Sequence, residues 1–187
     1  PYIRKTFSFK ENIKRARLYI TGLGLYWLEM NGKKVGEDFL APGCTAVDHL
    51  VQVYTYDLTK YLNEGQNALG IMMGNGWAKG KFGASSNWHL ETYIDDYLLK
   101  AELSVEYKDG TEDVISTDDT WKCAPSPVVE DSIYRGEVFD ARKIIPEWSC
   151  VECKDDEWAT MINIVPDKLG VLVDRLSLPI VKKETIS

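Results

Sequence analysis

The chain has 187 residues, of which 44% are hydrophobic and 27% charged, a composition typical of one globular domain with a real core. Acidic residues outnumber basic ones by 29 to 22, for a formal net charge of −7, so the phosphates of nucleic acid would meet like charge. No stretch approaches the roughly 20 apolar residues of a spanning helix. We therefore expect neither nucleic acid nor a membrane as a partner.

The first third of the chain is predicted to form strands. Aromatic and β-branched residues alternate with polar ones over Tyr2–Phe9, and residues 17–30 form an extended region that Gly22 and Gly24 interrupt. Asn31 and Gly32 then predict a type I′ hairpin turn. A further strand is expected over residues 50–56, followed by one helical turn over residues 57–62.

The remaining elements are also predicted to be strands. Residues 68–73 are apolar on both faces, which indicates a strand buried between two layers. Residues 99–108 alternate strictly, and Asp109 and Gly110 turn the chain into a hairpin partner that continues to Lys122. Apolar character returns over residues 171–181, which are expected to close the structure. No segment of about 12 residues keeps helical spacing, so the fold class is all-β, with a two-sheet sandwich favoured.

The four cysteines are too few for a disulfide-based scaffold. Cys150 and Cys153 have the spacing of a zinc or redox pair, but no second pair or nearby histidine completes a ligand set. Ordinary thiols are the favoured interpretation. The compartment stays open between bacterial periplasm, extracellular medium and cytoplasm.

Residues 18–36, LYITGLGLYWLEMNGKKVG, resemble the N-terminal β-sandwich domain of bacterial α-L-rhamnosidases, which belong to glycoside hydrolase family 78. Later segments support the resemblance in order and spacing: LAPG at 40–43, YTYDLT at 54–59, EGQNALG at 64–70, GNGW at 74–77 and YRGEVFDAR at 134–142. The ordered set is far more specific than any single segment.

The resemblance implies a jelly-roll-like two-sheet β-sandwich of the galactose-binding-like type over residues 1–181, with a family-like core at 16–148. Residues 182–187 would begin a linker to a catalytic α/α-toroid domain that hydrolyses terminal α-L-rhamnose from glycosides. The chain itself would be a non-catalytic accessory domain with that toroid as its partner. The alternative is a calcium-dependent module that binds rhamnose or another carbohydrate, as similar sandwiches do in some family members.

One loop departs from the family pattern. Family members commonly carry Trp-Thr-Asp-Tyr after Pro-Gly, whereas this chain continues with Cys44, Thr45, Ala46 and Val47. The loss of the aromatic and acidic residues weakens the case for sugar binding through this loop. Asp48 remains as a candidate cation ligand.

The best candidate for carbohydrate binding is the glycine-rich loop after residue 73. Sugar sites combine an aromatic surface with convergent polar groups, and this region supplies Asn75, Trp77, Lys79, Phe82 and Trp88. In the favoured alternative, Trp77 instead plugs one end of the sandwich and the glycines only permit a tight turn.

Glu137 and Asp140 are further candidates for a hard-cation site, although an ion pair between Arg142 and a carboxylate is favoured. The acidic pairs at 95–96, 118–119 and 130–131 are interpreted as solvated, because adjacent residues on a strand face opposite ways. With neither a Gly-x-Ser-x-Gly segment nor a phosphate-binding loop, we expect no catalytic residue in this chain and no cofactor apart from the calcium of the alternative function.

Overall fold

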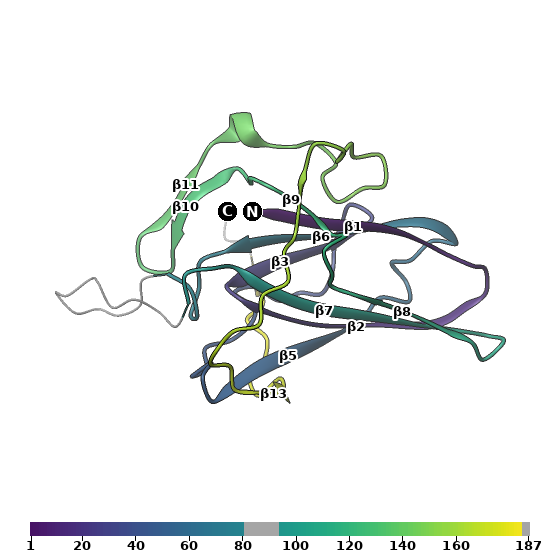
Figure 1. Ribbon diagram of the computed structural model, residues 1–187, viewed down its shortest axis with the longest axis horizontal. Helices are drawn as coiled ribbons and strands as arrows, with labels where there is room; N and C mark the ends of the chain where they lie inside the picture. The colour runs from purple at the N-terminus through teal and green to yellow at the C-terminus, as the bar shows by residue number, and fades with distance from the viewer. Residues whose placement is uncertain (81–93, 185–187) are drawn as a thin grey trace.

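Strands dominate the computed structural model, which describes residues 1–80 and 94–184 (Figure 1). One sheet has the order β12-β9-β1-β6-β3-β4. Its strands are β1 Tyr2–Phe9, β3 Leu25–Met30, β4 Lys33–Lys34, β6 Gly65–Gly74, β9 Lys122–Ala124 and β12 Ala159–Thr160. This sheet is the upper layer in Figure 1.

The second sheet, below the first in Figure 1, has the order β13-β5-β2-β7-β8. Its strands are β2 Ile13–Leu23, β5 Leu50–Asp57, β7 Leu98–Tyr107, β8 Glu112–Ser116 and β13 Val171–Asp174. Two further strands, β10 Val128–Ser132 and β11 Gly136–Phe139, form a separate hairpin, which leads into the 3₁₀ helix η1, Ala141–Lys143. The predicted jelly-roll-like β-sandwich is therefore confirmed.

The core lies between the two sheets, where alternate residues of each strand point inward. In β2, Leu18 and Ile20 are fully buried, and they lie opposite Leu103 and Ala101 of the neighbouring strand β7. The central strand β6 is buried on both faces from Asn67 to Ile71, as its apolar sequence predicts. In the described ranges, no helix is long and apolar enough to cross a membrane.

The predicted turns are largely confirmed. Asn31 and Gly32 have φ angles of 51° and 75° and join β3 to β4, as a type I′ turn requires. Gly24 has a φ of 140° and separates β2 from β3. The helical turn expected over residues 57–62 is reduced to one hydrogen bond, which Tyr61 N donates to Leu58 O at 2.8 Å, because β5 continues through Asp57.

The chain after β11 folds back over β1, where Arg4 fastens it. The Arg4 side chain is 1% exposed and pairs with Asp155. Its Nη2 donates to the Cys150 carbonyl at 2.6 Å, and its Nη1 donates to the Cys153 carbonyl at 3.4 Å. Both cysteines are free thiols. A single buried guanidinium therefore holds a long irregular segment in place through several acceptors.

The last described segment connects the two sheets. After β12 the chain runs down in front of the sandwich, drawn in yellow in Figure 1, and reaches β13. β13 pairs in parallel with β5, with Val171 opposite Leu50. The apolar segment predicted to close the sandwich thus joins it as an edge strand.

Candidate functional site

A polar hollow of about 530 Å³ lies between the loop after β6 and the β10–β11 hairpin. Two elements far apart in sequence therefore contribute to one concave surface. The side chains that matter for its chemistry are those of Asn75, Lys79, Tyr97, Asp131, Glu137 and Arg135.

Gly74 allows the hairpin to approach the loop backbone. A Cβ at this position would overlap the Asp131 carboxylate. That carboxylate accepts a hydrogen bond from Asn75 N at 2.6 Å, and Asn75 Nδ2 donates to the Asp131 carbonyl at 3.0 Å. The loop and the hairpin are thus joined by two hydrogen bonds.

The carboxyl groups of the hairpin interact across it. Asp131 and Glu137 are directly opposite in the strand register, which places their side chains on one face. Burial raises the pKa of Asp131, and the negative charge of Glu137 adds to the rise. Two acidic groups held this close together would favour a ligand that brings positive charge or hydrogen-bond donors.

Tyr97 supplies an aromatic surface beside these acids. Burial, with a contribution from Asp131, raises the pKa of Tyr97 to about 12, so its hydroxyl keeps its proton at neutral pH. This hydroxyl donates to Asn75 Oδ1 at 3.1 Å. The Lys79 ammonium lies 4.8 Å from the centre of the Tyr97 ring and donates to the Asp95 carbonyl. The hollow therefore combines a ring, a cation and carboxylates.

Three of the residues predicted from the sequence meet in this hollow, namely Asn75, Lys79 and Glu137. Trp77 lies elsewhere, beside a hollow of only about 10 Å³ whose lining includes Val47 and Val51. Phe82 and Trp88 lie outside the described residues.

The other candidate cation ligands have different neighbours. Asp140 accepts hydrogen bonds from Arg142 Nε at 2.8 Å and from Arg142 Nη2 at 2.9 Å. The Oδ2 atom of Asp48 lies 3.7 Å from Nε2 of His49. Within residues 1–80 and 94–184, no three His, Cys, Asp or Glu side chains gather into a group that could hold a metal ion.

The sequence did not point to two residues of this hollow, Asp131 and Tyr97. Because Asp131 belongs to an adjacent acidic pair, the sequence predicts that it is solvated, yet it is half-buried beside the loop after β6. The only local signal is the run from Gly74 to Gly76, since glycine permits a close backbone approach.

Comparison with known proteins gives a consistent result. A family model described as the α-L-rhamnosidase N-terminal domain matches residues 11–184. A curated α-L-rhamnosidase of Streptomyces avermitilis is 38% identical over 167 residues, which cover 88% of this chain and 16% of that protein. An α-L-rhamnosidase of Formosa agariphila is 32% identical over 188 residues, which cover 97% of this chain and 19% of that protein.

Solved structures agree with these relatives. The crystal structure of a Streptomyces avermitilis α-L-rhamnosidase complexed with L-rhamnose has a TM-score of 0.91 and 33% identity, over 98% of this chain and 18% of that one. The α-L-rhamnosidase from Dictyoglumus thermophilum has a TM-score of 0.84 and 35% identity, over 94% of this chain and 19% of that one. The chain spans less than a fifth of the length of these relatives. A Pleurotus ostreatus lectin, 19% identical with a TM-score of 0.54, shares the fold alone.

Proposed function

Because this chain belongs to the family of α-L-rhamnosidase N-terminal domains, we propose that it is a non-catalytic accessory domain of a longer enzyme. That enzyme would hydrolyse terminal α-L-rhamnose from glycosides, and residues 1–181 would form one domain that supports its catalytic domain. The observation that carries the proposal is the match of almost the whole chain to less than a fifth of several α-L-rhamnosidases.

The chemistry of the polar hollow supports a non-catalytic role. Hydrolysis of a glycoside uses two carboxyl groups, one as acid and one as base or nucleophile. In the hollow, the Asp131 carboxylate accepts the hydrogen bond that holds the β6 loop. The Asp131 carboxylate therefore has a structural role in joining the loop to the hairpin.

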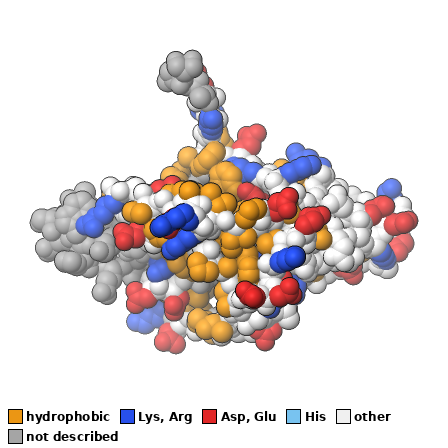
Figure 2. All heavy atoms as spheres, turned by 90° about the horizontal axis from the view of Figure 1, so that it is seen from above, with side chains coloured by type: hydrophobic (Ala, Val, Ile, Leu, Met, Phe, Trp, Pro, Cys, Tyr) orange, Lys and Arg blue, Asp and Glu red, His pale blue; other side chains and the backbone are white. Residues whose placement is uncertain are grey.

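The surface supports a role in packing against another domain. Seen from above, a band of hydrophobic side chains crosses the molecule between charged groups (Figure 2). The β10–β11 hairpin and η1, which are uppermost in Figure 1, expose Val138, Phe139 and Ile144 to about half of their possible extent. Exposed apolar surface is typical of interaction sites.

The test compares the longer enzyme with and without this domain. Removal is expected to lower the unfolding temperature and the turnover of an aryl α-L-rhamnoside, and the isolated 187-residue chain is expected to show no turnover. Activity of the isolated chain that survives repeated purification would overturn the non-catalytic assignment. Unchanged stability and turnover after removal would overturn the supporting role.

A second candidate function is weak binding of a rhamnose-containing saccharide in the polar hollow, with calcium as a possible requirement. It is favoured by the meeting of Asn75, Lys79 and Glu137 around Tyr97, since ring stacking and convergent polar groups recognise sugars. The dissociation constant would lie between about micromolar and millimolar.

Calorimetric titration with L-rhamnose, with and without calcium, tests this second function. Saturable heat that Lys79→Ala and Glu137→Gln abolish would locate the site in the hollow. Asp48→Ala is the matched control, because Asp48 belongs to the other candidate loop. No heat up to high millimolar sugar would rule the hollow out as a rhamnose site.

A further inference from the structure

The C-terminal segment of the described chain is unusually apolar for a surface. We call residues 161–180 the strap. Within it Val165 is 91% exposed, Leu178 is 89% exposed and Ile162 is 75% exposed. Other large hydrophobic side chains of the strap are also exposed: Ile164, Leu169, Val171, Leu172, Leu176 and Ile180. Single exposed hydrophobic residues are common, but this density over twenty residues is not.

The strap is held in place by polar contacts. Arg175 pairs with Asp38 at 2.7 Å and lies 4.4 Å from the centre of the Tyr54 ring. The Leu176 amide donates to the Gln52 side chain at 2.8 Å. The backbone is therefore fixed to the sandwich while its apolar side chains remain outside. Such an arrangement presents a preorganised apolar surface.

β13, within the strap, lacks cover on both faces. Neighbouring residues of a strand point to opposite sides of the sheet. Val171 is 68% exposed and Leu172 is 48% exposed. A strand that faced solvent on one side only would bury one of the two, so β13 presents apolar side chains on both faces.

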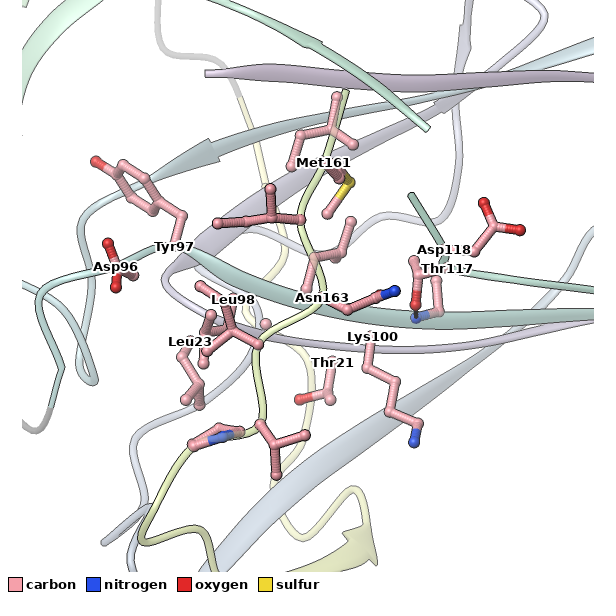
Figure 3. Close-up of a pocket in the computed structure, with 18 of the residues that line it drawn as sticks. Thr21, Leu23, Asp96, Tyr97, Leu98, Lys100, Thr117, Asp118, Met161 and Asn163 are labelled. Carbon is pink, nitrogen blue, oxygen red and sulfur yellow. Dashed lines mark hydrogen bonds between the residues drawn. The ribbon is translucent and has the colours of Figure 1, made fainter. Parts of the chain in front are cut away.

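A hollow of about 750 Å³ lies beside the upper part of the strap. Figure 3 shows Met161 and Asn163 on the strap, in front of the strands that carry Thr21 and Lys100. Thr21 is only 6% exposed, yet its hydroxyl has no hydrogen-bond partner among the described residues. A buried polar group without a partner costs free energy, so a group that fills the hollow and pairs with Thr21 would remove this cost.

We propose that the strap and this hollow form the docking surface for the catalytic domain of the same polypeptide. The inference rests on the proposed function, and it names the surface through which this domain supports the catalytic domain. The relatives are more than five times as long as this chain, which supplies a covalently attached partner large enough to cover the strap. That partner would present an apolar surface to Val165 and Leu178, and a hydrogen-bonding group to Thr21.

The alternative site of docking is the apolar face of the β10–β11 hairpin, where Val138 is 53% exposed. The hairpin lines the polar hollow, but among the described residues that hollow contains no buried hydroxyl without a partner. The hollow beside the strap contains Thr21, and the strap exposes far more apolar side chains, so the observations favour the strap.

Hydrogen exchange of the strap amides provides the test, measured in the 187-residue chain and in the longer enzyme. Docking is expected to slow exchange at residues 161–180 by at least about tenfold in the longer enzyme, which corresponds to about 1.4 kcal/mol. Val165→Asp and Leu178→Asp should abolish this protection there. In the 187-residue chain the same substitutions should leave the unfolding temperature unchanged, because both side chains face solvent.

Three outcomes would overturn the inference. Equal exchange of the strap in both chains would show that nothing covers it. If Val138→Asp weakened the contact with the catalytic domain, whereas Val165→Asp and Leu178→Asp did not, docking would occur at the hairpin. Strap protection that depends on protein concentration would identify a second copy as the occupant. Removal of the whole domain tests the proposed function separately. If removal still lowers stability and turnover, the proposed function holds even where the strap is not the docking surface.

Discussion

Replacement of Arg4 by Met is expected to release the segment that Arg4 fastens over β1. The variant keeps the apolar stem and removes the guanidinium, so the Cys150 and Cys153 carbonyls and Asp155 lose their donor. A lost hydrogen bond of this kind costs about 1–3 kcal/mol, and removal of one partner of a buried ion pair costs about 3–5 kcal/mol. Because Asp155 is 24% exposed and water can reach it, we expect about 3–5 kcal/mol for the whole change.

Urea unfolding followed by circular dichroism measures this loss. Tryptophan fluorescence reports separately on the released segment, since the Trp148 ring stacks on Tyr2 with centroids 4.4 Å apart. Arg142→Met is the matched control. Its side chain is 90% exposed, so a change below about 0.5 kcal/mol is expected.

Asp155→Asn separates the two kinds of contact that Arg4 makes. The substitution removes the ion pair but leaves both carbonyl acceptors, so its cost is expected to be about 1–2 kcal/mol. A loss below about 1 kcal/mol for Arg4→Met would refute the view that Arg4 is the principal fastening. An equal loss in Asp155→Asn and Arg4→Met would show that the carbonyl contacts contribute nothing.

Further predictions concern the hollow and the first hairpin. Gly74→Ala should push Asp131 away from the β6 loop and lower the free energy of unfolding by about 1–3 kcal/mol, measured in urea. Because the pKa of Asp131 is raised in the folded protein, protonation of Asp131 stabilises the fold at low pH. This stabilisation is lost as pH rises from about 4 through the raised pKa. Asp131→Asn should therefore gain stability relative to the parent over this pH range. Asn31→Ala should cost about 2–4 kcal/mol in the same assay, because it removes hydrogen bonds to Tyr61, Asn67 and Ala68 at a positive φ angle.

Each of these has a contrary result. An unchanged unfolding midpoint for Gly74→Ala would mean that the hairpin does not need its close approach to the loop. A stability difference between Asp131→Asn and the parent that stays constant from pH 3 to about 6 would contradict the raised pKa. If Asn31→Gly, which tolerates the positive φ angle, matched the stability of the parent, the side-chain hydrogen bonds of Asn31 would contribute nothing.

Local signals in the sequence were sufficient for most strands and turns. The strict alternation over residues 99–108 predicted β7 to within one residue at each end, since one face of the strand lies on the core. The hairpin at Asn31 followed from the ability of Asn and Gly to adopt positive φ angles. Both signals act between residues close in sequence.

Long-range pairing had no comparable signal. The parallel pairing of β13 with β5 joins segments more than a hundred residues apart, and alternation within a strand does not specify its neighbour. The sequence therefore predicts the strands but not the order in which they pair within each sheet.

The candidate site was only partly predictable for the same reason. The sequence indicates Asn75 and Lys79 because they lie in the glycine-rich loop beside Trp77, but their meeting with Glu137 depends on where the β10–β11 hairpin lies. The half-burial of Asp131 depends on the missing side chain of Gly74, a contact between residues far apart in sequence. Neither effect can be predicted from a short stretch of sequence, because each depends on a contact between distant residues.

The position of β1 between β6 and β9 has a consequence for synthesis of the protein. Tyr2 is opposite Met72 in one neighbour and Ala124 in the other, so β1 cannot complete its hydrogen bonds to both neighbours until most of this domain has been synthesised. Such high contact order predicts slow folding, on a scale of about milliseconds to seconds for β-rich domains. During that wait, Arg4 and Lys5 place positive charge on the unpaired strand, a feature that discourages pairing with other nascent chains.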